Sequence, residues 1–239
     1  MKIYFVTPFP QLVKSVLGES ILRRAEEKKL VSYNIVDLRQ FGEGKYCQID
    51  DYPFGGGTGM VMMPEPLFKA MDWVCEQIGD EEKRVIFPTP QGEKYTQDTA
   101  RELSQCEYLV FICGHYKGVD ERVIETHVSD EYSIGDYVVT GGEIPSMVIL
   151  DSIVRLIPGV LGDEESARTD SFFHKLLDHP HYTRPKVVRG MEVPDVLLSG
   201  HHAKIDEWRQ AQREKRTHER RPDIWEKYNK EKIEMENEL

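Results

Sequence analysis

Several short segments combine glycine with polar or aromatic residues, and they are the part of the sequence best suited to binding a small molecule. They span Tyr52–Met60, Pro88–Gly92, Cys113–Gly118 and Ser133–Gly142. Glycine lets a ligand approach the backbone closely, and ligands of open α/β sheets bind at the carboxyl ends of the strands. The segments favour a nucleotide-like ligand, although each one alone is equally consistent with a tight turn.

The best-known nucleotide-binding motifs do not match these segments. The glycine run at 55–59 is not followed by Gly-Lys-Ser/Thr, so it is not a Walker loop. Met60 stands where the dinucleotide fingerprint needs its last glycine. No nucleophile elbow is found either. On these residues alone, the protein could also be a nucleotide-binding α/β enzyme of a different class, an oxidoreductase or a hydrolase.

Histidines near the C-terminus raise the question of a metal. They are His179, His181, His201 and His202. No cysteine or acid completes a ligand set with them at a usual spacing, so we expect no structural metal. The cysteines Cys47, Cys75, Cys106 and Cys113 lack paired spacing, which favours a reduced intracellular compartment.

The composition indicates a globular, soluble protein. The chain has 239 residues, 39% of them hydrophobic, with neither a signal peptide nor a membrane-spanning apolar run, so a cytoplasmic location is expected. The net charge of −11 argues against nucleic acid, but the stretch from Lys204 to Arg221 is locally basic. That stretch is explained by a solvated helix face, and a non-catalytic RNA-binding module is the alternative explanation.

Strand and helix patterns alternate along the first 160 residues. Buried strands are predicted at Lys2–Val6, Val31–Asp37, Arg84–Phe87 and Tyr108–Cys113. Helices are predicted from the stripe Val13, Leu17, Ile21 and Ala25, and over Pro64–Ile78, Thr96–Ser104 and Ile144–Leu156. This alternation predicts the α/β class, a parallel sheet flanked by helices.

The remaining chain has a different character. Residues 161–180 are acidic and lack a sustained period, which predicts a linker, and residues 181–239 predict a small all-helical domain with a break at Pro222. The helix Ile144–Leu156 is apolar almost all round, so it belongs in a core or an interface. Residues 1–160 then form the main domain.

Longer motifs carry a resemblance that composition does not supply. They are Tyr52–Met63, Gly118–Val123, Ser133–Val138, Gly141–Glu143, Arg155–Gly162, Asp170–Phe172, His181–Pro185, Gly190–Pro194 and Leu197–His201. In this order they resemble the bacterial tRNA (guanine-N1)-methyltransferases of the SPOUT superfamily, from the N-terminus to beyond residue 220.

The resemblance implies a homodimer with a deep trefoil knot in residues 1–160, a tRNA-binding C-terminal domain, and an active site shared between subunits. The implied reaction moves a methyl group from S-adenosylmethionine to N1 of the guanosine immediately 3′ of the tRNA anticodon. The implied cofactor contacts are Pro88, Thr89, Pro90, Gly114, Ile134, Gly135, Asp136, Tyr137, Val138, Val139, Gly141 and Gly142. Lys117 departs from the family, in which many relatives carry glutamate.

The reaction needs one base for the proton on guanine N1 and one cation for the charge that builds on O6. By the resemblance, Asp170 is the base and Arg155 the cation. Each residue has a structural alternative, because Asp170 could cap a helix and Arg155 could pair with Asp151. Asp51 is the next candidate base. The family also implies that magnesium assists, at a position that no motif locates.

Overall fold

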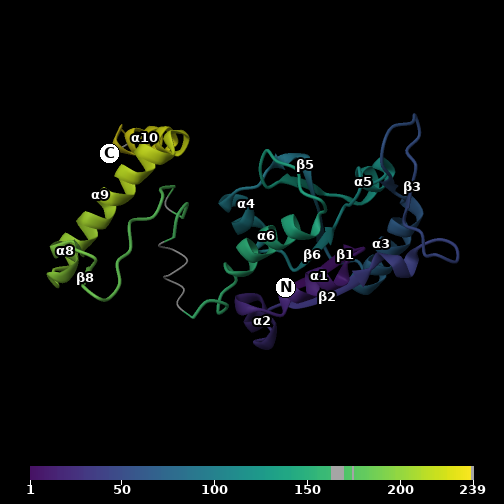
Figure 1. Ribbon diagram of the computed structural model, residues 1–239, viewed down its shortest axis with the longest axis horizontal. Helices are drawn as coiled ribbons and strands as arrows, with labels where there is room; N and C mark the ends of the chain where they lie inside the picture. Colours follow the sequence, from purple (N-terminus) through teal and green to yellow (C-terminus); the bar gives the residue numbers. More distant parts are fainter. Residues whose placement is uncertain (163–169, 174, 238–239) are drawn as a thin grey trace. The chain divides into compact units, whose positions relative to one another are not determined.

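The computed structural model describes residues 1–162, 170–173 and 175–237. The chain divides into two compact units, Met1–Gly162 and Asp163–Leu239. Figure 1 shows the helices and strands of both, with labels where there is room. The predicted linker over 161–180 lies partly outside the described residues.

A five-stranded sheet organises the first unit. Its order is β2-β1-β6-β5-β7, and every neighbouring pair is parallel. The strands are β1 (Lys2–Thr7), β2 (Ser32–Asp37), β5 (Lys83–Lys94), β6 (Tyr108–Ile112) and β7 (Asp130–Ser133). This confirms the predicted parallel sheet and the α/β class. Two short strands, β3 (Asp50–Asp51) and β4 (Val61–Met62), pair separately within the long loop.

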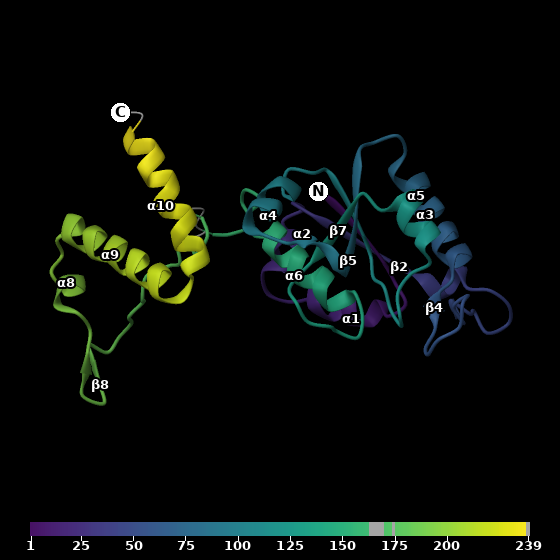
Figure 2. The ribbon, with the colours of Figure 1, turned by 90° about the horizontal axis from the view of Figure 1, so that it is seen from above.

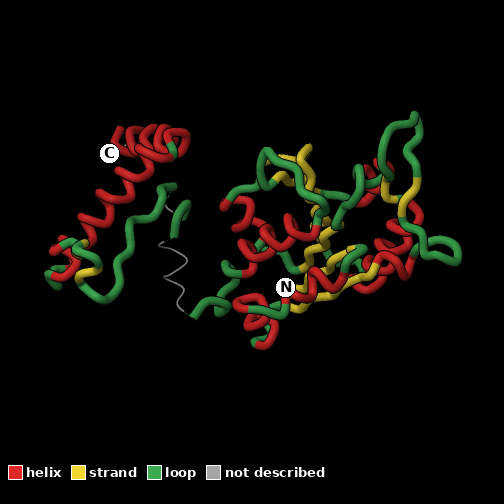
Figure 3. The backbone as a smooth tube through the Cα atoms, viewed as in Figure 1, coloured by secondary structure: helices red, strands yellow, loops and turns green. Residues whose placement is uncertain are grey.

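Helices cover both faces of the sheet, as Figures 2 and 3 show. On one side lie α1 (Pro10–Leu17), α2 (Ser20–Glu27), α4 (Gln97–Leu103) and α6 (Glu143–Val154), and on the other lie α3 (Pro64–Ile78) and α5 (Glu121–His127). The short 3-10 helix η1 spans Leu38–Phe41.

The alternation of side chains along the central strands explains this double cover. In β1, Ile3 and Phe5 belong to one buried cluster, and Tyr4 and Val6 belong to the other. Phe5 stacks on Phe111 of β6 with ring centroids 5.1 Å apart. Because successive side chains point to opposite faces, a strand that is apolar throughout needs helices on both sides.

Local sequence fixes where several helices begin. Pro64 opens α3, where its missing N–H would have no partner in any case. The Thr96 hydroxyl accepts a hydrogen bond from the backbone N–H of Thr99 at 3.3 Å, which caps α4. The Asp120 carboxylate caps α5 in the same way, with the N–H of Arg122 at 3.1 Å.

The structure corrects the sequence prediction in three elements. The predicted single helix through Val13 and Ala25 is two helices, because α1 ends at Gly18 and Ser20 has a φ of 49°. Strand β7 and helix α5 were not predicted. Strand β7 reads Asp-Glu-Tyr-Ser, which lacks the apolar run of the central strands, because it lies at the edge of the sheet.

The second unit is mainly helical over its described residues. It contains α8 (Asp195–Leu198), α9 (His202–Arg220) and α10 (Pro222–Asn237), and the chain changes direction before Pro222 as predicted. It also contains the antiparallel pair β8 (Val187–Val188) and β9 (Met191–Glu192), so the expectation of an all-helical unit was wrong in this respect. Among the described helices, none is long and apolar enough to cross a membrane.

Candidate functional site

A cavity of about 430 Å³ opens at the carboxyl end of the sheet. Three chain segments form most of its wall. The first is the outward bend of β5 after Pro88, where the pairing register with β7 shifts. The second is the loop after β6, and the third is the loop between β7 and α6. This is where ligands of parallel α/β sheets bind, and the volume suits a small organic molecule.

The cavity brings together nearly all the residues that the family resemblance assigned to cofactor binding. The following line it: Pro88, Thr89, Pro90, Gly114, Ile134, Gly135, Tyr137, Val138, Val139, Gly141 and Gly142. Asp136 is exposed and is not among the described lining residues. The contact of these residues with a cofactor stays a prediction.

The loops after β6 and before α6 meet by backbone contact. The Gly142 N–H donates to the Gly114 carbonyl at 2.7 Å. A Cβ on Gly142 would lie 2.7 Å from the Gly114 nitrogen and 2.9 Å from the Cys113 Cα, so only glycine fits this approach. The Ser146 hydroxyl donates to the Gly142 carbonyl at 2.7 Å from the first turn of α6. Two loops that are distant in sequence are therefore held together.

A buried carboxyl group lies beneath this contact. The Glu143 side chain accepts a hydrogen bond from the Thr7 hydroxyl at 2.7 Å, and its other oxygen lies 3.1 Å from Nε2 of His115. Glu143 is only 2% exposed. The Thr7 oxygen also accepts the Phe9 N–H at 2.9 Å. One side chain, that of Glu143, therefore connects the end of β1, the loop after β6 and the start of α6.

Sequence reasoning missed this network and several polar residues of the cavity wall. The missed lining residues are Gln91, His115, Glu121, Glu131, Ser133 and Thr140. His115 and Thr140 lie inside glycine segments that the sequence singled out, so they could have been found there. Thr7 is the last residue of the buried strand β1, and nothing in its local sequence marks it.

Lys117, which departs from the residue that the family resemblance leads us to expect, lies in the cavity wall. Its aliphatic stem covers Gly59, since a Cβ on that glycine would lie 2.9 Å from the Lys117 Cγ. Its backbone N–H donates to the Met60 carbonyl at 3.0 Å. The end of the glycine-rich loop, at Gly59 and Met60, therefore packs against this side of the cavity.

The two predicted catalytic residues belong to different units. Arg155 follows the last residue of α6, and it is not among the described residues that line the cavity. Asp170 lies in the second unit, where its carbonyl accepts the Phe173 N–H at 3.3 Å in a turn. The fallback base Asp51 lies in β3 and is exposed. Their catalytic roles stay predictions.

The histidines have an acidic neighbour that was not expected. No acid was expected to complete a ligand set with them, but Asp178 lies beside both His179 and His181. Burial lowers the pKa of His179. Burial raises the pKa of Asp178, yet hydrogen bonds from His181 and from the His179 N–H outweigh this and leave the pKa below its usual range.

Comparisons with known proteins identify the relatives of this chain. The family model described as "tRNA (Guanine-1)-methyltransferase TrmD" matches residues 1–227. Proteins named tRNA (guanine-N(1)-)-methyltransferase from Anoxybacillus flavithermus and Shouchella clausii are each 55% identical over 228 residues, which cover 95% of this chain and 93% of theirs. The protein of that name from Staphylococcus carnosus is 54% identical over 95% of this chain and 92% of its own.

The close approach at Gly142 generates a prediction about stability. Its backbone conformation is one that alanine adopts, so only the steric clash opposes Gly142→Ala. Overpacking of this kind costs about 1–3 kcal/mol of unfolding free energy, which urea denaturation would measure. Gly162→Ala is the matched control, because a Cβ there meets nothing within 4 Å. Equal stability of the two variants would contradict the tight crossing.

Proposed function

The chain belongs to the tRNA (guanine-1)-methyltransferase family, and from this premise we propose that it transfers a methyl group from S-adenosylmethionine to N1 of the guanosine immediately 3′ of the tRNA anticodon. The observation that carries the proposal is the match over residues 1–227 together with the cavity at the carboxyl end of the sheet. Family membership favours this enzyme over the two alternatives considered from sequence. The protein is proposed to act in the cytoplasm.

The cavity is proposed to hold S-adenosylmethionine. Its wall offers apolar surface from Ile134, Val138 and Val139, and backbone groups from the loops. Such a mixture suits an adenine ring, whose faces are apolar and whose edge forms hydrogen bonds. The trefoil knot of the family is part of the proposal, and the contact between the loops at Gly114 and Gly142 supports it.

Charge in the cavity also fits this cofactor. Lys117 would oppose the positive sulfonium, but Glu121 and Glu131 also line the wall. These carboxylates can offset the lysine and face the cationic end of the cofactor. They are proposed to supply the negative charge that Lys117 does not provide.

The methyl group on a sulfonium is already reactive, so the protein must align guanine N1 with it and remove the N1 proton. Asp170 is the proposed base, and Arg155 is proposed to stabilise the charge that develops on O6. An active site shared between the subunits of a homodimer, as the family resemblance implies, is part of the proposal. The magnesium that the resemblance implies stays a prediction.

The second unit is the proposed tRNA-binding part, in keeping with the division of the chain after Gly162. Arg209 and Arg216 of α9 are candidates for phosphate contacts. Arg213 of the same helix is a further candidate. Arg209 and Arg213 each also lie near a carboxylate of their own unit, Asp206 at 3.2 Å and Asp178 at 3.4 Å, so part of their charge is engaged there.

A homodimer is proposed from an apolar surface beside the cavity. Helix α6 is buried on most sides but exposes Ile144 and Val148, and the neighbouring α1 exposes Leu12 and Val16. A hollow of about 200 Å³ lies between Phe9 and Ile144. Exposed apolar patches that adjoin a ligand site mark protein contacts. A second copy of the chain is the proposed occupant of this surface.

The proposed reaction is tested by methyl transfer from labelled S-adenosylmethionine to transcribed tRNA. We expect incorporation at the guanosine that follows the anticodon, because it presents N1 outside a base-paired stem. A transcript with that guanosine replaced by adenosine is the control and should take up no label. Equal incorporation into both transcripts would contradict the proposed position.

Asp170→Asn should preserve cofactor binding and slow the chemical step by about 10²–10⁴-fold, because asparagine keeps the size of the side chain but cannot accept the N1 proton. Single-turnover methylation with the pre-formed complex measures that step apart from product release. Asparagine is nearly as good a helix cap as aspartate. A rate within threefold of the parent protein would therefore support a structural role and move the search to Asp51.

Val148→Asp should shift the protein toward the monomer mass in light scattering, because it places a charge on the proposed contact surface, where Val148 is 49% exposed. Ile233→Asp is the matched control, since Ile233 is 57% exposed on α10 and belongs to the other unit. A parent protein that is already monomeric would contradict the proposed dimer.

A further inference from the structure

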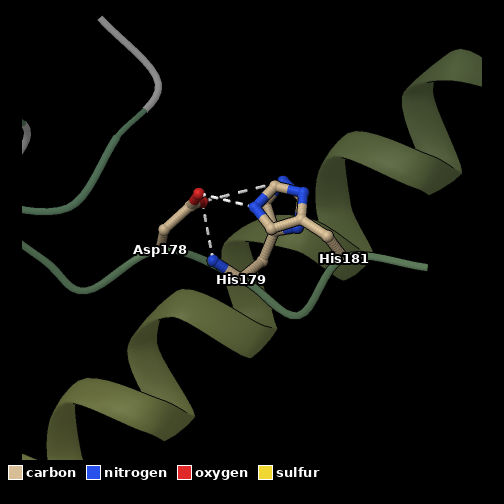
Figure 4. A group of neighbouring side chains, drawn as sticks. All are labelled: Asp178, His179 and His181. Carbon is tan, nitrogen blue, oxygen red and sulfur yellow. Dashed lines mark hydrogen bonds and ion pairs between the residues drawn. The ribbon is translucent and has the colours of Figure 1, made fainter. Parts of the chain in front are cut away.

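We propose that Asp178, His179 and His181 form a binding site for a divalent transition-metal ion of the zinc type (Figure 4). One potential ligand atom from each side chain lies within 4.8 Å of the other two. The site lies entirely within the second unit. It is independent of the methyl-transfer proposal and is tested without an activity assay.

The ligand atoms need only a small movement to enclose an ion. The His181 Nε2 lies 2.7 Å from Oδ2 of Asp178, and the His179 Nε2 lies 3.8 Å from Oδ1. A tetrahedral zinc ion holds such atoms about 3.4 Å apart, given bonds of about 2.0–2.1 Å. The two measured distances end on different oxygens of the Asp178 carboxylate, and each lies within about 1 Å of this value. A small rotation of the carboxylate, or binding through both of its oxygens, would let the ion take the place of the proton between His181 and Asp178.

Neighbouring groups orient the ligands. The His179 Nδ1 lies 3.1 Å from the Pro180 carbonyl, which favours the proton on Nδ1 and leaves the Nε2 lone pair directed at Asp178. The Asp178 carboxylate accepts the His179 N–H at 2.7 Å, and the Asp178 N–H donates to the Ser171 hydroxyl at 2.9 Å. Such outer contacts fix the rotation of metal-binding side chains before the ion arrives.

Burial is graded across the three residues. His179 is 9% exposed and its ring packs edge-on against Trp208, with centroids 6.4 Å apart. The His181 side chain is 69% exposed. An ion held here would have protein on one side and solvent on the other, so water could fill the fourth position. The exposed histidine also provides a route of entry.

The choice of metal follows from the ligand types. Two imidazoles and one carboxylate suit zinc, cobalt, nickel or copper, whereas magnesium prefers oxygen ligands alone. Arg213 lies beside Oδ1 of Asp178 at 3.4 Å, and its positive charge weakens the attraction for a cation. The other carboxylate oxygen, Oδ2, faces His181 and remains directed toward the proposed ion.

The test uses the full-length protein without a histidine tag. Co²⁺ is titrated into metal-free protein while the visible absorption is recorded, and Zn²⁺ binding is then measured by competition. We expect one equivalent of Co²⁺ to bind, Zn²⁺ to displace it, and a hundredfold excess of Mg²⁺ to leave it bound. His179→Ala and His181→Ala should each weaken Co²⁺ binding at least tenfold.

The control variant is His201→Ala, because His201 is exposed and lies outside the cluster. It should bind Co²⁺ as the parent protein does. Circular dichroism would show whether His179→Ala folds. If it does not, His181→Ala still tests the proposal, because the His181 side chain is exposed and its loss should leave the fold intact. The proposal is overturned if the parent protein binds no stoichiometric Co²⁺, if His181→Ala binds as tightly as the parent, or if Mg²⁺ displaces the Co²⁺.

Discussion

The buried carboxyl group of Glu143 is the interaction on which the candidate site depends. It joins Thr7 at the end of β1 to His115 after β6, and it does so from the first turn of α6. A buried carboxyl group without partners would be very costly, so the three segments are stable only when they meet. Glycine is required at the same point, because the backbones at Gly114 and Gly142 touch.

This crossing explains how a parallel α/β sheet without a known nucleotide fingerprint forms a ligand site. The loops after β6 and β7 are held together by the Gly142–Gly114 hydrogen bond, so the cavity beside them is present without a ligand. Preorganisation of this kind lowers the entropic cost of binding. The proposed chemistry also needs a base and a cation, and Asp170 and Arg155 are proposed to supply them from outside the described cavity wall.

The sequence predicted those helices and strands in which the pattern of apolar residues follows burial directly. Strand β1 from Ile3 to Val6 and strand β6 are buried on both faces because helices cover both, and Pro64 marks the start of α3. Strand β7 was not predicted because it lies at the edge of the sheet and lacks an apolar run. The end of α1 at Gly18 was not predicted because the apolar spacing continues across it. The cavity residues came from the family resemblance. The hydrogen bond from Thr7 to Glu143 joins residues far apart in the chain, so no local sequence pattern predicts it. The Asp178 cluster depends on the backbone path through His179 and His181, which local patterns do not predict either.

Titration calorimetry of S-adenosylmethionine with the parent protein and with Glu143→Ala tests the central claim most directly. The substitution leaves Thr7 and His115 without this partner, and an unsatisfied buried polar group costs about 1–3 kcal/mol. The account predicts that the parent protein binds the cofactor and that the folded variant binds it at least tenfold more weakly. A parent protein that does not bind S-adenosylmethionine, or a variant that binds within threefold of the parent, would contradict it.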